Sequence, residues 1–316
     1  MRVAVFTEPH RGATYDDQLR FAQLAEQGGF DAFLRADHYQ AMGDDPAPPG
    51  PTDAWLTLAA LARETSRIRL GTLVTSATFR LPGPLAVMVA QVDQMSGGRV
   101  ELGIGAGWYA REHVSYGIPF PGISERFDRL TEQLDVITGL WRTPPGGTFT
   151  YAGDHYQLTD CPALPRPVQT PGPPVIIGGR GPKRTPELAA RYADEFNVPF
   201  TSVAQTREAY ERVRDACERV GRSADGRPPL TLSAGIVVAI GRTDSEAQRR
   251  AAPLHVKSAL PPEDSVIGSA QQLVDRIGEF AAIGADRVHL RLIELADLDH
   301  LELIASEVLP QLDGNR

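Results

Sequence analysis

The stretch FDAFLRADHY, residues 30–39, is the starting point for reading the fold. Its first seven residues are mostly apolar and are typical of a short buried strand. The run then stops at three polar residues, Asp37, His38 and Tyr39. A surface turn could end in this way for solubility, and an enzyme that builds its active site on strand ends could do so for chemistry. The segments on either side distinguish the two.

Working outward from this stretch, apolar strands and amphipathic helices alternate along nearly the whole chain. Residues 15–30 predict one helix, which ends at Gly28 and Gly29, and residues 53–66 predict the next. The expected strands lie at 2–6, 31–36, 68–76, 99–107, 174–179, 194–200, 230–240 and 286–294. Eight βα units predict an α/β fold, a (β/α)8 TIM barrel formed by a single domain of residues 1–316. A doubly wound sheet uses fewer strands and would leave two units unexplained.

The alternation is interrupted between about residues 143 and 174, which are rich in Pro and Gly. We interpret this segment as an insertion after the fourth βα unit, with a hairpin at residues 149–158. We expect the wall of a substrate pocket to come from residues 151–161 of this segment and from residues 254–268. Neither stretch carries a motif that identifies a substrate.

Composition narrows the class of protein. The chain has 316 residues and a formal net charge of -8, which argues against a general nucleic-acid-binding surface. Cys161 and Cys217 are the only cysteines, so no disulfide framework is expected. The first residues do not resemble a signal peptide, and no apolar run is long enough to cross a membrane. We therefore expect a cytoplasmic protein.

Asp37 and His38 directly follow the second expected strand. In a TIM barrel the functional groups gather at the carboxyl ends of the strands, so this position predicts a catalytic role. An imidazole can donate or accept a proton near neutral pH, and a neighbouring carboxylate can tune it. The alternative is a strand-terminal turn in which His38 only contacts the backbone.

The third and fourth strands end in residues suited to holding a flat ligand. Leu73 and Val74 can form an apolar wall, and Ser76 can hydrogen-bond a polar edge, although ordinary β-propensity would also explain this tail. Residues 103–107 read G-x-G-x-G, which is not the G-x-G-x-x-G fingerprint of dinucleotide-binding domains. These glycines instead favour close approach of a ligand to the backbone, beside the aromatic Trp108 and Tyr109.

The segment IIGGRGPKRTPELAARYA, residues 176–193, predicts a phosphate site. Glycines follow a strand, Lys183 and Arg184 add positive charge, and Thr185 with Pro186 can begin a helix. It is not a Walker A loop, and a turn with solvated basic residues is the alternative. No metal site is expected, because the seven histidines are scattered without a ligand motif. No G-x-S-x-G elbow is present either.

Three stretches together resemble the luciferase-like flavin and deazaflavin oxidoreductases of the bacterial luciferase superfamily, especially the branch that uses coenzyme F420. They are residues 30–39, residues 68–108 and residues 176–197, in this order and spacing. The resemblance covers nearly the whole chain. It implies a (β/α)8 barrel with the planar tricycle of the cofactor lying across the mouth at the carboxyl ends of the strands.

The resemblance also implies roles for individual residues. A non-prolyl cis peptide between Leu73 and Val74 would form a bulge behind the central ring of the tricycle. Asp37 and His38 would hold the polar edge of the ring system and reach the reacting centre. The remaining positions implied to contact the cofactor are Ser76, Gly105, Ala106, Gly107, Gly178, Gly179, Arg180, Gly181, Lys183 and Arg184.

The chain departs from the deazaflavin-dependent sugar-phosphate dehydrogenases of this family at the substrate side. Trp108 stands where those enzymes carry an acidic residue, and Met42 stands where they carry a tryptophan. The segment NVPFTSVAQ, residues 197–205, lacks the basic residue expected there. These departures argue against a phosphorylated sugar and predict that Trp108 and Met42 contact a different substrate.

The sequence thus predicts an F420-dependent oxidoreductase that moves a hydride between the deazaflavin C5 and a small organic substrate. Reduction of a C=C, C=N or C=O bond is the favoured direction, with His38 supplying the proton. The alternatives are an FMN-dependent monooxygenase of the same superfamily, a catalytically silent barrel retained as an accessory subunit, and a cofactor-free lyase or isomerase. A small-molecule substrate is the expected partner, and a homodimer is a candidate assembly.

Overall fold

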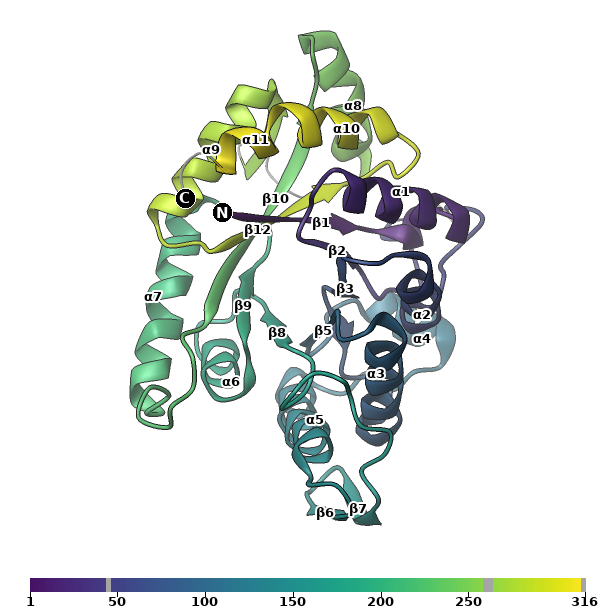
Figure 1. Ribbon diagram of the computed structural model, residues 1–316, viewed down its shortest axis with the longest axis vertical. Coiled ribbons are helices and arrows are strands. Elements are labelled where there is room, and N and C mark those ends of the chain that lie inside the picture. Colours follow the sequence, from purple (N-terminus) through teal and green to yellow (C-terminus); the bar gives the residue numbers. More distant parts are fainter. Residues whose placement is uncertain (44–46, 258–263, 314–316) are drawn as a thin grey trace.

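The computed structural model describes residues 1–43, 47–257 and 264–313. Within this part of the chain, eight parallel strands close into a barrel in the order β1-β2-β3-β5-β8-β9-β10-β12, and β12 returns to β1 (Figure 1). The predicted (β/α)8 TIM barrel is therefore confirmed. The barrel strands are β1 (Arg2–Thr7), β2 (Ala32–Arg35), β3 (Arg69–Thr72), β5 (Val100–Gly105), β8 (Val175–Gly178), β9 (Glu195–Val198), β10 (Thr231–Ile240) and β12 (Arg287–Leu292).

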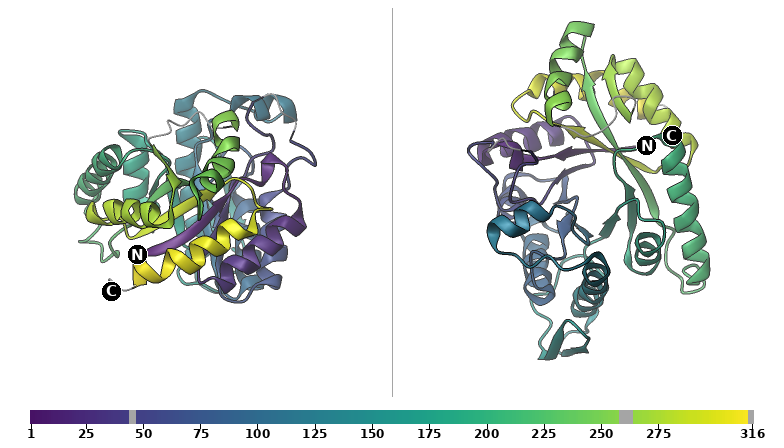
Figure 2. Two further views of the ribbon diagram at one scale, coloured as in Figure 1. Left: turned by 90° about the horizontal axis from the view of Figure 1, so that it is seen from above. Right: turned by 180° about the vertical axis from the view of Figure 1, so that it is seen from behind.

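The helices surround the barrel, as Figure 1 and the view from behind in Figure 2 show. Their apolar faces pack on the outer side of the strands and form the main hydrophobic core, while Ala251 of the helix at residues 244–257 belongs to a small separate cluster. Helix α1 illustrates the local rules, because Thr14 and Asp17 form a capping box at its start. The helices are α1 (Tyr15–Gln27), α2 (Ala54–Glu64), α3 (Pro82–Ser96), α4 (Ala110–Tyr116), α5 (Ile123–Arg142), α6 (Arg184–Tyr192), α7 (Val203–Arg219), α8 (Asp244–Lys257), α9 (Ala270–Ala282), α10 (Leu298–Glu307) and α11 (Leu309–Asp313), together with the 3-10 turn η1 (Pro9–Arg11).

Several elements differ from the sequence-based expectation. The third strand is divided into β3 and a short β4 (Thr75–Ser76), which flank a cis peptide between Leu73 and Val74. Helix α4 stands between β5 and α5, in residues 110–116, for which the sequence pattern predicts a loop. A short strand β11 (Ser265–Gly268) pairs in parallel with β10.

The expected hairpin is present as β6 (Phe149–Ala152) and β7 (Gln157–Cys161). These two strands form a separate antiparallel sheet beyond the end of α5, away from the barrel mouth (Figure 1).

The amino-terminal end of the barrel interior is filled by a buried ionic cluster. Arg287, at the start of β12, contacts Glu101 of β5 at 2.8 Å and Glu195 of β9 at 2.9 Å. Glu195 also pairs with His289 at 2.7 Å. Burial would raise the pKa of Glu195, but the charges of Arg287 and His289 outweigh burial and lower it. This cluster leaves the carboxyl ends of the strands as the place for a ligand cavity.

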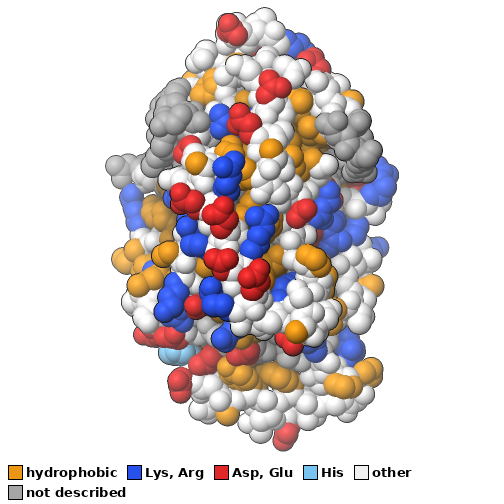
Figure 3. All heavy atoms as spheres, turned by 90° about the vertical axis from the view of Figure 1, so that its left-hand side faces the viewer, with side chains coloured by type: hydrophobic (Ala, Val, Ile, Leu, Met, Phe, Trp, Pro, Cys, Tyr) orange, Lys and Arg blue, Asp and Glu red, His pale blue; other side chains and the backbone are white. Residues whose placement is uncertain are grey.

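The outer surface carries both signs of charge. Figure 3 shows the face on the left of Figure 1, where acidic and basic side chains are interspersed. This arrangement differs from the continuous basic footprint that a phosphate backbone requires. None of the helices in the described residues combines the length and the apolar character needed to cross a bilayer.

Candidate active site

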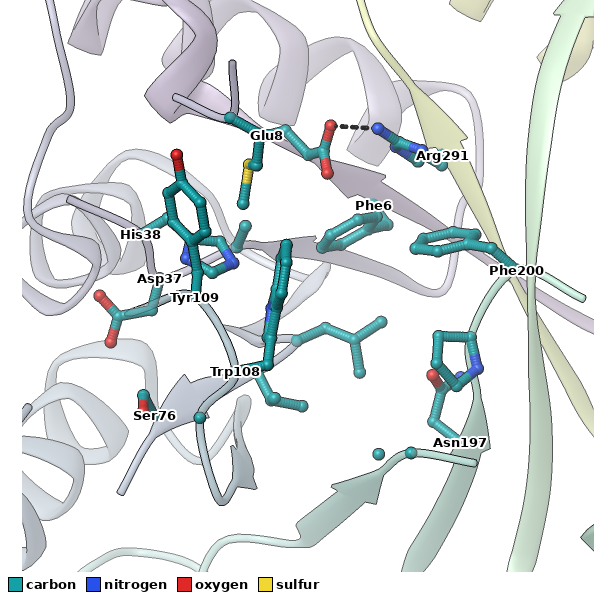
Figure 4. A pocket seen from close by; sticks show the side chains of 18 of the residues that line it. Phe6, Glu8, Asp37, His38, Ser76, Trp108, Tyr109, Asn197, Phe200 and Arg291 are labelled. Carbon is teal, nitrogen blue, oxygen red and sulfur yellow. Dashed lines mark hydrogen bonds and ion pairs between the residues drawn. The ribbon is translucent and has the colours of Figure 1, made fainter. Parts of the chain in front are cut away.

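A cavity of about 710 Å³ lies at the carboxyl ends of the barrel strands (Figure 4). It is lined by Phe6, Glu8, Arg11, Ala36, Asp37, His38, Met42, Leu73, Val74, Ser76, Gly107, Trp108, Tyr109, Glu112, Gly178, Gly179, Arg180, Asn197, Pro199, Phe200 and Arg291. Eleven of the residues singled out from the sequence are among them. The expectation that residues 151–161 form a pocket wall is wrong, because none of them lines this cavity. Residues 254–268, the other expected wall, lie partly outside the described residues.

The floor of the cavity is built around the cis peptide between Leu73 and Val74, which the family resemblance implied and the structure contains. The side chain of Val74 fits between three glycines of the neighbouring strands. A Cβ added at Gly103, Gly105 or Gly178 would lie only 3.1–3.3 Å from a methyl carbon of Val74. The glycines therefore leave the space that Val74 occupies.

The rim beside the floor is held by small polar contacts. Gly107 has a φ of +79°, and a Cβ at this position would overlap the hydroxyl oxygen of Ser76. Ser76 Oγ lies 2.6 Å from Thr78 Oγ1, which lies 2.6 Å from His113 Nε2. Glycine is needed at position 107 both for its backbone angle and for this contact.

His38 pairs with Glu112, a residue that the sequence analysis missed. His38 Nδ1 lies 2.9 Å from Glu112 Oε1, and Glu112 Oε2 accepts a hydrogen bond of 2.9 Å from the backbone N–H of Tyr39. Glu112 is only 1% exposed and lies on α4. Its carboxylate thus fixes both the imidazole and the backbone that carries it.

Asp37 is not the carboxylate that contacts His38, although the sequence placed the two side by side. Arg80 donates to Asp37 at 2.5 Å and to Asp53 at 2.6 Å, and Thr75 donates to Asp37 at 2.9 Å. Burial opposes ionisation of Asp53, but its bond from the Leu56 backbone and the Arg80 charge lower its pKa. The Arg80 pairs anchor the end of β2 to the segment after β4.

A second imidazole packs behind His38. The ring centroids of His10 and His38 are 5.0 Å apart, with the rings edge to face. Burial lowers the pKa of His10 to about 3, although Glu8 acts in the opposite direction. His10 is therefore neutral at physiological pH and adds no charge beside His38.

The side of the cavity away from His38 combines an ion pair with aromatic rings. Glu8 lies 2.6 Å from Arg11 and 2.6 Å from Arg291. Burial would raise the pKa of Glu8, but Arg291 and Arg11 outweigh it and lower the pKa to about 2. The Phe6 and Phe200 rings lie 5.7 Å apart, and the Arg291 guanidinium lies 5.1 Å from the Phe200 ring.

The predicted phosphate loop lies only partly at the cavity. Gly178, Gly179 and Arg180 line it, and the Gly179 N–H donates to the carbonyl of Asn197 at 3.0 Å. The Gly179 N–H therefore already has a hydrogen-bond acceptor in the neighbouring strand and is not free to bind a phosphate. Arg184 turns away to α5, where it pairs with Asp128 at 2.5 Å.

Five predicted contact residues, Gly105, Ala106, Gly181, Lys183 and Arg184, are not among the lining residues. No group of three or more potential metal ligands is found within the described part of the chain.

Residues 1–263 match the model of a protein family described as luciferase-like monooxygenase. The chain belongs to this family. The match covers β1 to α8 and thus includes every cavity-lining residue except Arg291.

Members of the family and related structures carry the names of different enzymes. The F420-dependent glucose-6-phosphate dehydrogenase of Microbacterium testaceum is 35% identical over 216 residues, which cover 66% of this chain and 61% of that protein. The oxygenase component of the flavin-dependent trigonelline monooxygenase of Acinetobacter baylyi is 27% identical over 343 aligned residues. This alignment covers 96% of this chain and 91% of that protein.

A solved F420-dependent secondary alcohol dehydrogenase superposes with a TM-score of 0.81 at 20% identity, covering 98% of each chain. This last likeness concerns the fold alone.

Proposed function

We propose that this protein is an F420-dependent oxidoreductase that reduces a C=O, C=N or C=C bond of a small organic molecule. The observation that carries the proposal is that the His38–Glu112 pair and the cis peptide between Leu73 and Val74 lie at one cavity of about 710 Å³. The 35% identity to a relative named as F420-dependent supports the choice of cofactor.

The residues around the floor fit a flat ring system with an anionic tail. Leu73 and Val74 offer an apolar surface, and the Val74 side chain fills the space left by Gly103, Gly105 and Gly178. Arg180 and the start of α6 lie on one side and provide positive charge and a helix N-terminus for the tail. Arg184 is tied to Asp128 and would contribute less to this site than the sequence suggested.

Leu73, Val74 and Arg180 would hold a reduced deazaflavin, which would supply the hydride for the substrate carbon. His38, in its imidazolium form, would donate its Nε2 proton to the heteroatom or to the second carbon of the reduced bond, so that the substrate gains two hydrogens and His38 is left as the neutral imidazole. Glu112 accepts a hydrogen bond from Nδ1 and thereby leaves Nε2 as the nitrogen that faces the cavity. Asp37 has a structural role, because its carboxylate binds Arg80 and Thr75 and thereby fixes the end of β2.

An FMN-dependent monooxygenase is the second candidate. The similarity to the trigonelline monooxygenase component over 96% of the chain favours it. Fluorescence titration of the protein with oxidised F420 and, separately, with FMN distinguishes the two. We expect saturable binding of F420 and at least tenfold weaker binding of FMN; tight FMN binding without any F420 response would overturn the proposal.

Two further alternatives are tested in the same system. An accessory subunit without catalysis predicts that His38→Ala leaves every measurable activity unchanged. A cofactor-free lyase or isomerase predicts turnover without any added deazaflavin or flavin. A homodimer is the assembly we propose, and light scattering coupled to size-exclusion chromatography measures it.

A further inference from the structure

The aromatic part of the cavity carries an inference about the substrate, which rests on the function proposed above. Three rings from different strand ends point into the same part of the cavity: Phe6 from β1, Trp108 after β5 and Phe200 after β9 (Figure 4). Met42 also lines the cavity.

Trp108 presents an uncovered ring to the cavity. It is 64% exposed, whereas the two other tryptophans, Trp55 and Trp141, are 2% and 4% exposed. His38 contacts it edge to face at 5.8 Å and Tyr109 lies at 5.3 Å. A large apolar surface left open inside a concave site marks a place that a ligand covers.

Phe200 is held in place by an unusual backbone conformation. Its φ is +40°, in the left-handed region that bulky residues rarely adopt. The ring packs over Gly235, where an added Cβ would lie 2.9 Å from a ring carbon. Such conformations persist only where the surroundings fix them, and they gather at functional sites. The ring is thus presented to the cavity by contacts with Gly235, Phe6 and Arg291.

The charged groups on this wall contact one another. Glu8 lies between Arg11 and Arg291, with 2.6 Å to each. A charged substrate would have to compete with these buried pairs, which is costly in a site screened from water. A neutral substrate leaves them intact.

We propose that this part of the cavity binds a neutral substrate that contains a flat ring, stacked between Trp108 on one side and Phe200 with Phe6 on the other. The bond to be reduced is attached to the ring and points toward His38. Aromatic stacking contributes roughly a two- to tenfold gain in affinity for each ring contact. The site therefore discriminates against open-chain molecules and against phosphorylated sugars.

The test compares two neutral ketones with nine carbons each, flat indan-1-one and open-chain nonan-5-one, by calorimetric titration of the cofactor-saturated protein. We expect indan-1-one to bind at least tenfold more tightly. Trp108→Ala and Phe200→Leu should each weaken indan-1-one binding by about three- to tenfold and change nonan-5-one binding less than twofold. Leu164→Ala, a control at a position that is 62% exposed and outside the cavity, should change neither. Equal affinities for the two ketones, or equal losses for both in the variants, would overturn the proposal.

A second readout separates this inference from the proposed function. Of the three tryptophans, Trp108 alone is exposed, so acrylamide quenching of tryptophan fluorescence reports mainly on this residue. We expect indan-1-one to protect it, even in protein without cofactor, and lack of protection refutes the ring site. Failure of F420 to bind in the separate titration refutes the proposed function instead. Thermal unfolding of each variant shows whether it is folded.

Discussion

Replacement of Glu112 tests the proposed proton transfer most directly. Glu112 is buried and makes two charge-assisted contacts of 2.9 Å, one with His38 Nδ1 and one with the Tyr39 N–H. Hydrogen bonds to a charged group contribute about 1.5–3 kcal/mol each. If the contact with His38 acts in the transition state, its loss lowers kcat by roughly 10- to 100-fold. We expect Glu112→Gln, which retains one acceptor oxygen, near the lower limit and Glu112→Ala near the upper limit.

The assay is single-turnover oxidation of reduced F420 by a saturating ring ketone, followed by absorbance. The dissociation constant of oxidised F420, measured by fluorescence, should change less than threefold in both variants, because Glu112 is proposed to act on His38. The double variant His38→Ala with Glu112→Ala should be no slower than His38→Ala alone, since the two residues act as one unit. Multiplicative losses in the double variant, or a Glu112→Ala enzyme within twofold of wild type, would refute the reasoning.

Three further predictions concern stability. Arg80→Met should lower the free energy of unfolding by about 3–5 kcal/mol, because it leaves the buried Asp37 carboxylate without its ion pair; urea unfolding measures this, and a loss below 1 kcal/mol would contradict it. Glu8 has a pKa of about 2 in the folded state against an ordinary 4.5, so the unfolded chain takes up the proton first as the pH falls. About 3 kcal/mol of stability present above pH 4.5 should thus be lost toward pH 2, and Glu8→Gln should flatten this acid limb in urea unfolding measured from pH 6 to 2. Gly103→Ala should cost about 1–3 kcal/mol, because the added methyl overlaps the backbone oxygen of Thr72, whereas Gly278→Ala in α9, with open space around it, should be neutral or stabilising in the same thermal unfolding assay.

The sequence predicts the barrel because each βα unit has its own spacing of apolar residues. This spacing depends only on neighbouring residues and therefore indicates strands and helices without knowledge of the fold. The same reasoning locates His38, since it directly follows a short buried strand. It misses Glu112, which lies 74 positions further along the chain on α4, a short helix that the sequence analysis assigned to a loop. Only the closed barrel brings these two side chains together.

Arg184 and Phe200 also show what local sequence patterns do not determine. For Arg184 the pattern predicts a contact that the structure lacks, and for Phe200 it gives no sign of a conformation that the structure has. Arg184 has the charge and position expected of a phosphate contact, yet a distant acid on α5, Asp128, takes its guanidinium. Phe200 follows a proline in an ordinary segment, and nothing local indicates its positive φ. That angle depends on Gly235 in a neighbouring strand and on the ring of Phe6. Long-range partners of this kind are not encoded in any local pattern.

The ionic cluster around Arg287 has a consequence for the order of events during turnover. The cluster closes the amino-terminal end of the barrel. In the part of the chain that the structure describes, the cavity opens at the carboxyl ends of the strands, and we expect ligands to enter and leave there. On the proposed function, turnover requires that the molecule on the Leu73–Val74 floor binds before the one that stacks on Trp108; a ring molecule that binds first blocks the way to the floor. The molecule on the floor can depart only after its partner has gone. If the proposed function holds, the substrate site is filled last and emptied first, and departure of the reduced product governs how soon the oxidised cofactor is exchanged.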